Sequence, residues 1–336
     1  MGKICWHYDL LYFGGIETSL LTLLKQFSDK NMFVAHRQQY FTRKDTYERI
    51  KNVVDIVDTD KEKEVKADIA VFSGMIFDYP TIFNKIKAKK RIGWIHFIPG
   101  EQCVFENMLI YPEYTNKIDY WVCVSETSKR GLLKYIPNAK VEVIHNTINE
   151  EEIKRLATVP IKLYDNRQLS FVTSARLSQE KGIELMIEFI KRIHDSGISY
   201  VWYLLGDGID PDTIEMINEA REKYNIVTPG FVENPYNIIS KCDYGLLLSP
   251  RESWGIFPDE CHILGIPTIT LNWDAIYERE NIENYGIILK PDLSNLKINE
   301  ILSKKGIYKE NLKSYKYIND LNKWYNLFSR IYKEIE

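Results

Sequence analysis

Short apolar runs alternate with longer amphipathic segments along most of the chain. Residues 3–8 predict a strand, and residues 17–27 predict a helix in which Leu20, Leu24 and Phe27 recur at helical spacing. This alternation is typical of βαβ units and parallel sheets, and continuous apolar runs favour strands buried on both faces. Further strands are predicted in the first half at residues 32–35, 53–57, 69–72, 91–95, 120–124 and 141–144.

The pattern loosens over residues 145–168, a polar stretch that includes Pro160. Such a stretch is typical of a connection between domains. A second series of strands follows, separated by helical segments that include residues 183–193 and 211–224. Strands in this series are predicted at residues 169–174, 200–205, 226–229, 244–248, 268–271 and 287–289.

Residues 315–335 predict a helix with one broad aromatic face. A face of that kind must be buried, so we expect this helix to pack back on the N-terminal domain. The fold class is α/β, with two Rossmann-like, doubly wound domains facing each other across a cleft. The expected N-terminal domain covers residues 1–150 together with 315–336, and the C-terminal domain covers residues 166–314. This architecture alone does not choose between dehydrogenases, epimerases, transferases and periplasmic binding proteins.

The composition argues against nucleic acid as a partner and excludes little else. The chain of 336 residues has a net charge of only −3, which gives no electrostatic case for nucleic acid binding. Its five cysteines are scattered, without a C-x-x-C pair, and are interpreted as buried free thiols. No histidine lies near them at a spacing that would predict a zinc site.

No apolar stretch is long enough to span a bilayer, and the start of the chain does not read as a signal peptide. We therefore expect a cytoplasmic protein. Residues 84–94 carry five basic residues beside aromatic ones. The run is interpreted as a solvated helix end leading into a strand, or as peripheral contact with the anionic inner face of a membrane.

Candidate chemistry begins at Gly14 and Gly15, after the first predicted strand and at the start of a helix. Paired glycines let the backbone approach a ligand, and a helix N-terminus presents free N–H groups to an anion. A plain tight turn explains the pair equally well. The segment is not G-x-G-x-x-G, which disfavours a nicotinamide cofactor.

In the second half, Arg176 and Lys181 lie on one loop at the end of a predicted strand. A guanidinium and an ammonium there could both reach a diphosphate, and Gly182 would let the next helix begin close to it. Two solvated basic residues are the alternative. Gly206, after the next strand, and the pair Phe231 and Val232, after another, are weaker candidates for close backbone contact with a ligand.

The segment RESWGIFPDECHILG contains Glu252 in a loop and Glu260 within a helix. Carboxylates accept hydrogen bonds from two hydroxyls at once, which suits sugars and riboses. Gly255 at the loop–helix junction would leave N–H groups free for a phosphate. A surface carboxylate and a capping carboxylate would explain the charges but not the apolar Trp254 between them.

Together and in this order, these segments resemble the retaining GT-B glycosyltransferases, specifically glycosyltransferase family 4 (glycosyl transferases group 1). The resemblance spans nearly the whole chain. Its most specific parts are the pair Arg176 and Lys181 and the two glutamates separated by seven residues, Glu252 and Glu260. Residues 121–126 and 143–146 also match. Ser253, Trp254 and Cys261 depart from the family's usual residues beside the sugar pocket, which leaves the donor's identity open.

The resemblance implies a hexosyltransferase of polysaccharide biosynthesis that uses a nucleotide-diphosphate sugar, with UDP the expected base, and no cofactor or metal ion. The acceptor would be a glycan, a lipid-linked molecule or a protein, read by loops near residues 98–115. By position, Arg176 and Lys181 would bind the diphosphate, Glu252 the transferred sugar and Glu260 the ribose, while His96 would lie near the donor sugar. Residues implied to contact the donor also include Gly14, Gly15, Gly206, Phe231, Val232, Ser253, Trp254, Gly255 and Ile256.

Two other functions stay open. A non-hydrolysing UDP-sugar 2-epimerase shares the architecture and would need acid and base residues around the sugar. A non-catalytic partner subunit of another glycosyltransferase would keep the fold, although the presence of Arg176, Lys181, Glu252 and Glu260 argues against loss of the donor site.

Overall fold

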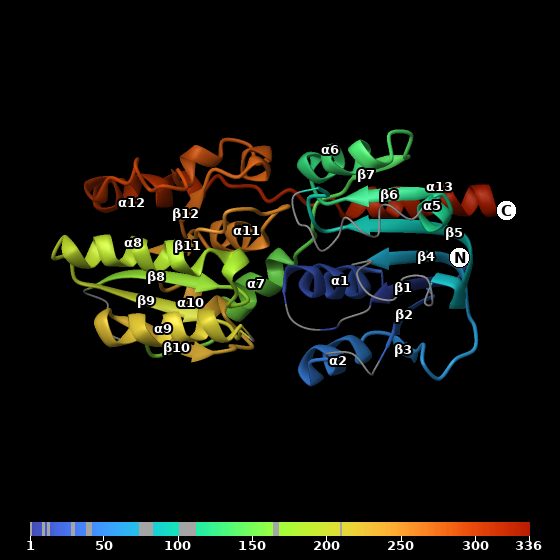
Figure 1. The fold of residues 1–336 in the computed structure, drawn as a ribbon, viewed down its shortest axis with the longest axis horizontal. Helices are drawn as coiled ribbons and strands as arrows, with labels where there is room; N and C mark the ends of the chain where they lie inside the picture. The colour runs from blue at the N-terminus through green and yellow to red at the C-terminus, as the bar shows by residue number, and fades with distance from the viewer. Residues whose placement is uncertain are drawn as a thin grey trace. The chain divides into compact units, whose positions relative to one another are not determined.

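The computed structural model describes residues 2–8, 11, 14–27, 31–37, 42–73, 83–100, 112–163, 168–208 and 210–336. The chain divides into two compact units, shown in Figure 1. The first comprises Met1–Ile148 with Ile318–Glu336, and the second comprises Asn149–Tyr317. Each is an α/β unit built on one parallel sheet.

In the first unit the strand order is β3-β2-β1-β4-β5-β6-β7, with every described pair parallel. Its described helices include α1 (Gly15–Gln26), α2 (Lys44–Lys51), α5 (Pro112–Thr115), α6 (Glu126–Tyr135) and the C-terminal helix α13 (Leu321–Ile335). The central strands are buried on both faces, as their continuous apolar runs predict. The strands are β1 (Ile4–Tyr8), β2 (Met32–His36), β3 (Asp55–Asp58), β4 (Val65–Ser73), β5 (Ile86–Ile95), β6 (Tyr120–Cys123) and β7 (Val141–Val143).

In the second unit the order is β10-β9-β8-β11-β12-β13, again parallel. One apolar cluster joins the strands to the helices that cover them. The strands are β8 (Leu169–Ser174), β9 (Tyr200–Leu205), β10 (Ile226–Gly230), β11 (Tyr244–Leu247), β12 (Thr268–Leu271) and β13 (Gly286–Leu289). The α-helices here are α7 (Glu150–Ala157), α8 (Ile183–Asp195), α9 (Pro211–Lys223), α10 (Tyr236–Ile239), α11 (Ile256–Ile263) and α12 (Ile298–Leu312).

Helix α7 lies within the stretch expected to be an irregular connection. The Asn149 side chain caps it by accepting a hydrogen bond from the Glu152 N–H at 3.0 Å, and acidic residues fill its first turn. The helix contacts α10 and α11, so it belongs to the second unit. Its single buried residue, Ile153, explains why hydrophobic spacing did not predict it.

The C-terminal helix α13 (Leu321–Ile335) packs on the first unit, as its aromatic content predicts. The ring centroid of Trp324 lies 5.3 Å from that of Trp6 and 5.1 Å from that of Trp94, both on buried strands. The helix begins six residues later than expected, because α12 ends at Leu312 and a non-helical segment follows. The predicted aromatic face is also narrower, since 46% of Tyr325 is exposed.

The basic run at residues 84–94 ends a short helical segment and then forms β5, which begins five residues earlier than expected. Its strand pairing with β4 extends from Val65–Ile86 onward. Lys89 is paired with Asp68 at 2.7 Å and Lys90 with Asp119 at 3.3 Å, so acidic partners let this lysine-rich segment join the sheet. Within the ranges given above, no helix is both long and apolar enough to cross a bilayer.

Each sheet changes its direction of winding at one point, between β1 and β4 in the first unit and between β8 and β11 in the second. In doubly wound sheets, ligands bind outside the carboxyl ends of the strands at such a switch point. The two loops that flank it in the second unit, after β8 and after β11, contain the basic pair and the first glutamate of the sequence motifs.

Candidate functional site

The switch point of the second sheet is bridged by one ion pair. Lys181 ends a 3-10 turn (Gln179–Lys181) after β8, and Glu252 lies in the loop after β11. The Lys181 Nζ donates to Glu252 Oε1 at 2.8 Å. The Glu252 side chain is only 9% exposed, against 25% for Lys181. A partly exposed ammonium is therefore fixed at the edge of the sheet where a ligand is expected.

Close backbone packing brings these loops together. Gly182 has a φ of 69°, and a Cβ built on it would lie 2.0 Å from the carbonyl oxygen of Leu248, at the end of β11. Gly206, after β9, meets the loop after β8 in the same way, since its Cβ would lie 1.9 Å from the Ala175 carbonyl oxygen. Only glycine fits at either position.

Arg176 lies on the same loop as Lys181 but is bound differently. Its guanidinium forms an ion pair with Glu180, and both side chains are about half exposed. Between them, the Ser178 hydroxyl is buried and has no hydrogen-bond partner among the described residues. A buried hydroxyl normally has a partner, so Ser178 is a functional candidate that the sequence did not single out.

Glu260 lies on α11 and is 7% exposed. Burial raises its pKa to about 7, although the Tyr236 hydroxyl, which donates to Glu260 Oε1 at 2.9 Å, opposes this shift. Tyr236 begins α10, and nothing in the sequence pattern marked it as part of the site. The structure does not join Glu260 to Glu252 directly; the two are held by different partners.

The loop between the two glutamates is supported from beneath by a buried polar network. The Trp254 side chain is fully buried, and its indole N–H donates to Asp259 Oδ2 at 2.9 Å. Arg279 binds the same carboxylate, lies 4.0 Å from the Trp254 ring centroid, and donates to the Gly255 carbonyl oxygen at 2.7 Å. Tyr315 donates to Asp259 Oδ1 at 2.9 Å. The Trp254 side chain thus faces the protein interior.

The weaker candidates also lie at the carboxyl end of the second sheet, where backbone hydrogen bonds hold the loops after β9 and β10. The backbone N–H of Phe231, just after β10, donates to Asp207 Oδ1 at 2.9 Å, and the Gly206 N–H donates to the Gly230 carbonyl oxygen. Val232 is partly buried against the core. Ser253, Gly255 and Ile256 are partly buried, and Ile256 is the first residue of α11, whose N-terminus follows Gly255 at a φ of 71°.

The remaining candidates belong to the first unit. His96 directly follows β5 and is 9% exposed, with its ring 4.1 Å from that of Trp94. Burial lowers the pKa of His96 to about 3, and an interaction with the Asn146 side chain opposes the shift. The imidazole is therefore neutral at pH 7. Gly15 begins α1, with Gly14 at its N-cap. Most of the loop expected to read the acceptor, residues 101–111, lies outside the described residues, as does Cys103.

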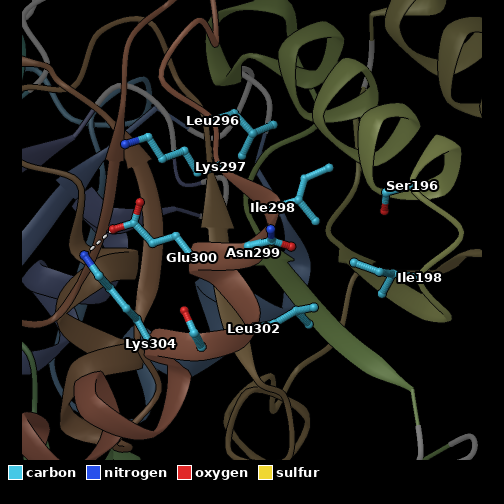
Figure 2. Close-up of a pocket in the computed structure, with 10 residues that line it drawn as sticks. Ser196, Ile198, Leu296, Lys297, Ile298, Asn299, Glu300, Leu302 and Lys304 are labelled. Atoms are coloured by element: carbon cyan, nitrogen blue, oxygen red, sulfur yellow. Dashed lines mark hydrogen bonds and ion pairs between the residues drawn. The ribbon is translucent and has the colours of Figure 1, made fainter.

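A separate cavity of about 950 Å³ lies at the amino-terminal end of β9, away from the carboxyl ends of the strands where the expected site residues lie. Figure 2 shows that it is lined by Ser196 and Ile198 on one side and by the first turns of α12 on the other, where Glu300 and Lys304 are paired. None of the expected site residues lines it. In the described part of the chain, no three His, Cys, Asp or Glu side chains are arranged to hold a metal ion.

Comparison with known proteins places this site in context. Residues 159–318 match the family model "Glycosyl transferases group 1", which covers the second unit almost completely. The O-antigen biosynthesis glycosyltransferase WclY of Escherichia coli is 27% identical over 41% of this chain and 39% of its own length. The alpha-galactosylglucosyldiacylglycerol synthase of Streptococcus pneumoniae is 26% identical over 58% of this chain and 56% of its own. The chain spans about half the length of the curated relatives it matches.

Among solved structures, HepE of Anabaena, in complex with UDP and glucose, superposes with a TM-score of 0.76 at 15% identity. The match covers 94% of this chain and 94% of HepE. This similarity shows the fold, which is the two-domain GT-B architecture expected from the sequence.

Proposed function

We propose that this chain is a retaining glycosyltransferase that moves a hexose or related sugar from a UDP-sugar to an acceptor hydroxyl. The observation that carries the proposal is the ion pair between Lys181 and Glu252 across the switch point of the second sheet. It places an ammonium for a diphosphate beside a carboxylate for sugar hydroxyls. The match of residues 159–318 to the glycosyltransferase model supports this interpretation.

In this proposal the donor diphosphate binds Arg176 and Lys181. Its negative charge competes with Glu180 for the Arg176 guanidinium, which the structure holds in a half-exposed ion pair. The buried Ser178 hydroxyl, on the same loop, supplies a further hydrogen bond. Charge that develops on the leaving diphosphate is stabilised by groups already in place, which is the largest contribution expected in such catalysis. These protein cations would make the transfer independent of a metal ion.

Glu252 and Glu260 have separate roles in the proposal. Glu252 holds hydroxyls of the transferred sugar, and Glu260 holds the ribose hydroxyls. Two hydroxyls donating to Glu260 would favour its charged form and lower its raised pKa. The Trp254 side chain is reassigned from donor contact to positioning, because it is buried in the network that supports the loop.

The sugar is transferred with retention in our proposal. The acceptor oxygen attacks the anomeric carbon from the face that the diphosphate leaves, through an ion-pair-like transition state. The new C–O bond forms as the C–O bond to phosphate breaks, and the hydroxyl proton passes to the departing diphosphate. Gly14, Gly15 and the neutral His96 are assigned to the acceptor side. A glycan or lipid-linked acceptor is favoured because relatives are named for O-antigen and glycolipid synthesis.

A thermal-shift screen of UDP, GDP and ADP with their sugars tests the donor. A ligand that binds only the folded state raises stability, by about 2.7 kcal/mol at a hundred times its Kd. We expect the uridine nucleotides to raise the melting temperature most. Incubation of the tightest donor with candidate acceptors, followed by NMR of the anomeric proton, then tests retention. Epimerised nucleotide-sugar formed without acceptor would instead establish the epimerase alternative, and a product of inverted configuration would refute retention.

A further inference from the structure

The two longest strands of the first sheet extend beyond their neighbours as a basic ribbon. Strand β1 pairs with β4 only from Ile69 onward, and β6 pairs with β5 only from Ile92 onward. Residues 65–67 of β4 therefore pair with residues 86–88 of β5 at the amino-terminal edge of the sheet, and Arg91, farther along β5, lies opposite Ala70. This edge is opposite to the carboxyl ends where His96 lies, so it is separate from the proposed transfer site.

The register of the ribbon places like charges next to each other. Lys66 on β4 lies directly opposite Lys87 on β5. Like charges at opposed positions of neighbouring strands are destabilising. Lys66 forms an ion pair with Glu64 at 3.4 Å, but the Lys66 side chain is 82% exposed, so this pairing is weak. An anion that bridges the two ammonium groups would relieve the repulsion.

A groove at this amino-terminal edge is lined by Lys66, Lys87 and other basic residues. It has a volume of about 530 Å³ and contains one carboxylate, Asp68, which is already engaged by Lys89 at 2.7 Å and by the Lys3 backbone N–H at 2.7 Å. Five basic residues and one acidic residue line the groove, so it has an excess of positive charge. The cationic residues that line it are Lys3, Lys66, Lys87, Lys89 and Arg91.

Arg91 adds a directional donor to the groove. Its guanidinium lies over the Phe83 ring, with Cζ 5.1 Å from the centroid. The Nε–H is buried and has no acceptor among the described residues. A guanidinium N–H held in one orientation by an aromatic ring is suited to a phosphate oxygen, while the lysines supply point charges around it.

We propose that this groove binds phosphate groups, with Lys66, Lys87 and Arg91 as the residues that contact them. The same chemistry is offered by the headgroups of an anionic membrane and by a free polyphosphate. The site does not depend on the proposed sugar transfer, because it lies at the other edge of the sheet and uses none of the residues assigned to the donor.

The test measures binding of the whole protein to two probes. The first is phosphatidylglycerol vesicles, with neutral phosphatidylcholine vesicles for comparison, in a flotation assay; the second is inorganic pyrophosphate, by titration calorimetry at constant ionic strength. The variant is Lys66→Gln/Lys87→Gln. Its control, Lys191→Gln/Lys223→Gln, removes the same charge from exposed positions on α8 and α9 of the second unit.

We expect the wild type and the control to bind at least one probe, and the Lys66→Gln/Lys87→Gln variant to bind it about thirtyfold more weakly, at roughly fivefold per basic residue. Binding to vesicles alone identifies a lipid headgroup as the source, and binding to pyrophosphate alone identifies a soluble phosphate. The proposal is overturned if neither probe binds, or if the control weakens binding as much as the variant does. The melting temperature of the variant without anion should not fall, because its substitutions remove a repulsion.

Discussion

The guanidinium of Arg279 and the carboxylate of Asp259 form a bidentate ion pair in the interior of the second unit. The Nε–Oδ1 distance is 2.8 Å and the Nη2–Oδ2 distance is 2.7 Å, and both side chains are at most 2% exposed. The pair joins the loop of Glu252, through the Gly255 carbonyl, to Tyr315 near the end of the second unit. It thus supports the proposed donor site without facing it.

Replacing Arg279 with leucine should lower the free energy of unfolding by about 3–5 kcal/mol, because Asp259 would stay buried without its cation. Lysine should not restore stability, since an ammonium cannot bind the carboxylate and the Gly255 carbonyl as the planar guanidinium does. Urea unfolding followed by fluorescence measures both changes. The matched control is Lys154→Met, which breaks an exposed pair with Glu150 and should change stability by about 0.5 kcal/mol or less. Equal effects of the two substitutions would contradict the supporting role of Arg279.

The Glu260 carboxyl should give the stability of the protein a distinct pH dependence. Its pKa is about 7 in the folded protein against 4.5 for the ordinary group, so the folded state holds this proton more tightly. The contribution of Glu260 to stability is therefore fully present below pH 4.5 and is lost as the pH rises through 7. The total change is roughly 3 kcal/mol.

Glu260→Gln should remove this pH-dependent contribution to stability, because glutamine does not titrate. The difference in unfolding free energy between Glu260→Gln and the wild type, measured by urea titration from pH 4.5 to 8, should shift in favour of the variant as the pH rises. His96 gives the free energy of unfolding a pH dependence of opposite sign: because its pKa is about 3 in the folded protein, stability falls as the pH drops below 6.5. This contribution is the same in the wild type and in the variant, so it cancels in the difference. A difference that does not change with pH would show that folding leaves the pKa of Glu260 unchanged.

Lys181→Met should lower kcat/KM for sugar transfer by about 10²–10³-fold, because it removes a preorganised charge from the leaving diphosphate. Lys191→Met, on the exposed face of α8, is the control and should leave the rate unchanged. Glu252→Gln combined with Lys181→Met gives a double-mutant cycle. Because the two side chains are bonded to each other, the loss in the double variant should be smaller than the product of the single losses. Independent effects would mean that the pair does not act as one unit.

The sequence predicted the sheets well because buried parallel strands are continuous apolar runs, such as Tyr200–Leu205. The sequence did not predict elements that are stabilised by ion pairs and not by buried apolar side chains. Strand β5 contains Lys87, Lys89 and Lys90, and its extent depends on acids that are distant in the chain. Helix α12 was missed because Gly306 interrupts a weakly patterned segment.

For the candidate site, motif spacing predicted the loops that meet but not the residues beneath them. Lys181 and Glu252 are 71 residues apart and are bonded, as their positions after neighbouring strands suggest. Asp259 could be suspected beside Glu260, but Arg279 lies in an ordinary charged stretch, and only the fold brings it to Asp259. The resemblance implied that Trp254 contacts the donor, and the sequence alone could not show that its side chain is buried against Asp259 and Arg279.

Gly182→Ala isolates the close backbone contact that brings the two loops of the proposed donor site together. An alanine there has two penalties: a left-handed backbone at a φ of 69°, and a Cβ 2.0 Å from the Leu248 carbonyl oxygen. Gly197→Ala is the matched control, because Gly197 has a φ of 75° and a Cβ there would meet nothing within 4 Å. The left-handed conformation costs about 1–2 kcal/mol for an L-residue, so Gly197→Ala should lose about that much stability.

The Gly182 variant should lose more than the Gly197 variant, because the end of β11 must move to admit the new methyl group. That movement would displace the loop of Glu252 from Lys181, so donor affinity should fall as well, whereas the Gly197 variant should bind donor as the wild type does. Urea unfolding and calorimetric titration with UDP measure the two effects. If both variants lost equal stability and kept equal affinity, the contact between Gly182 and Leu248 would have no part in shaping the site.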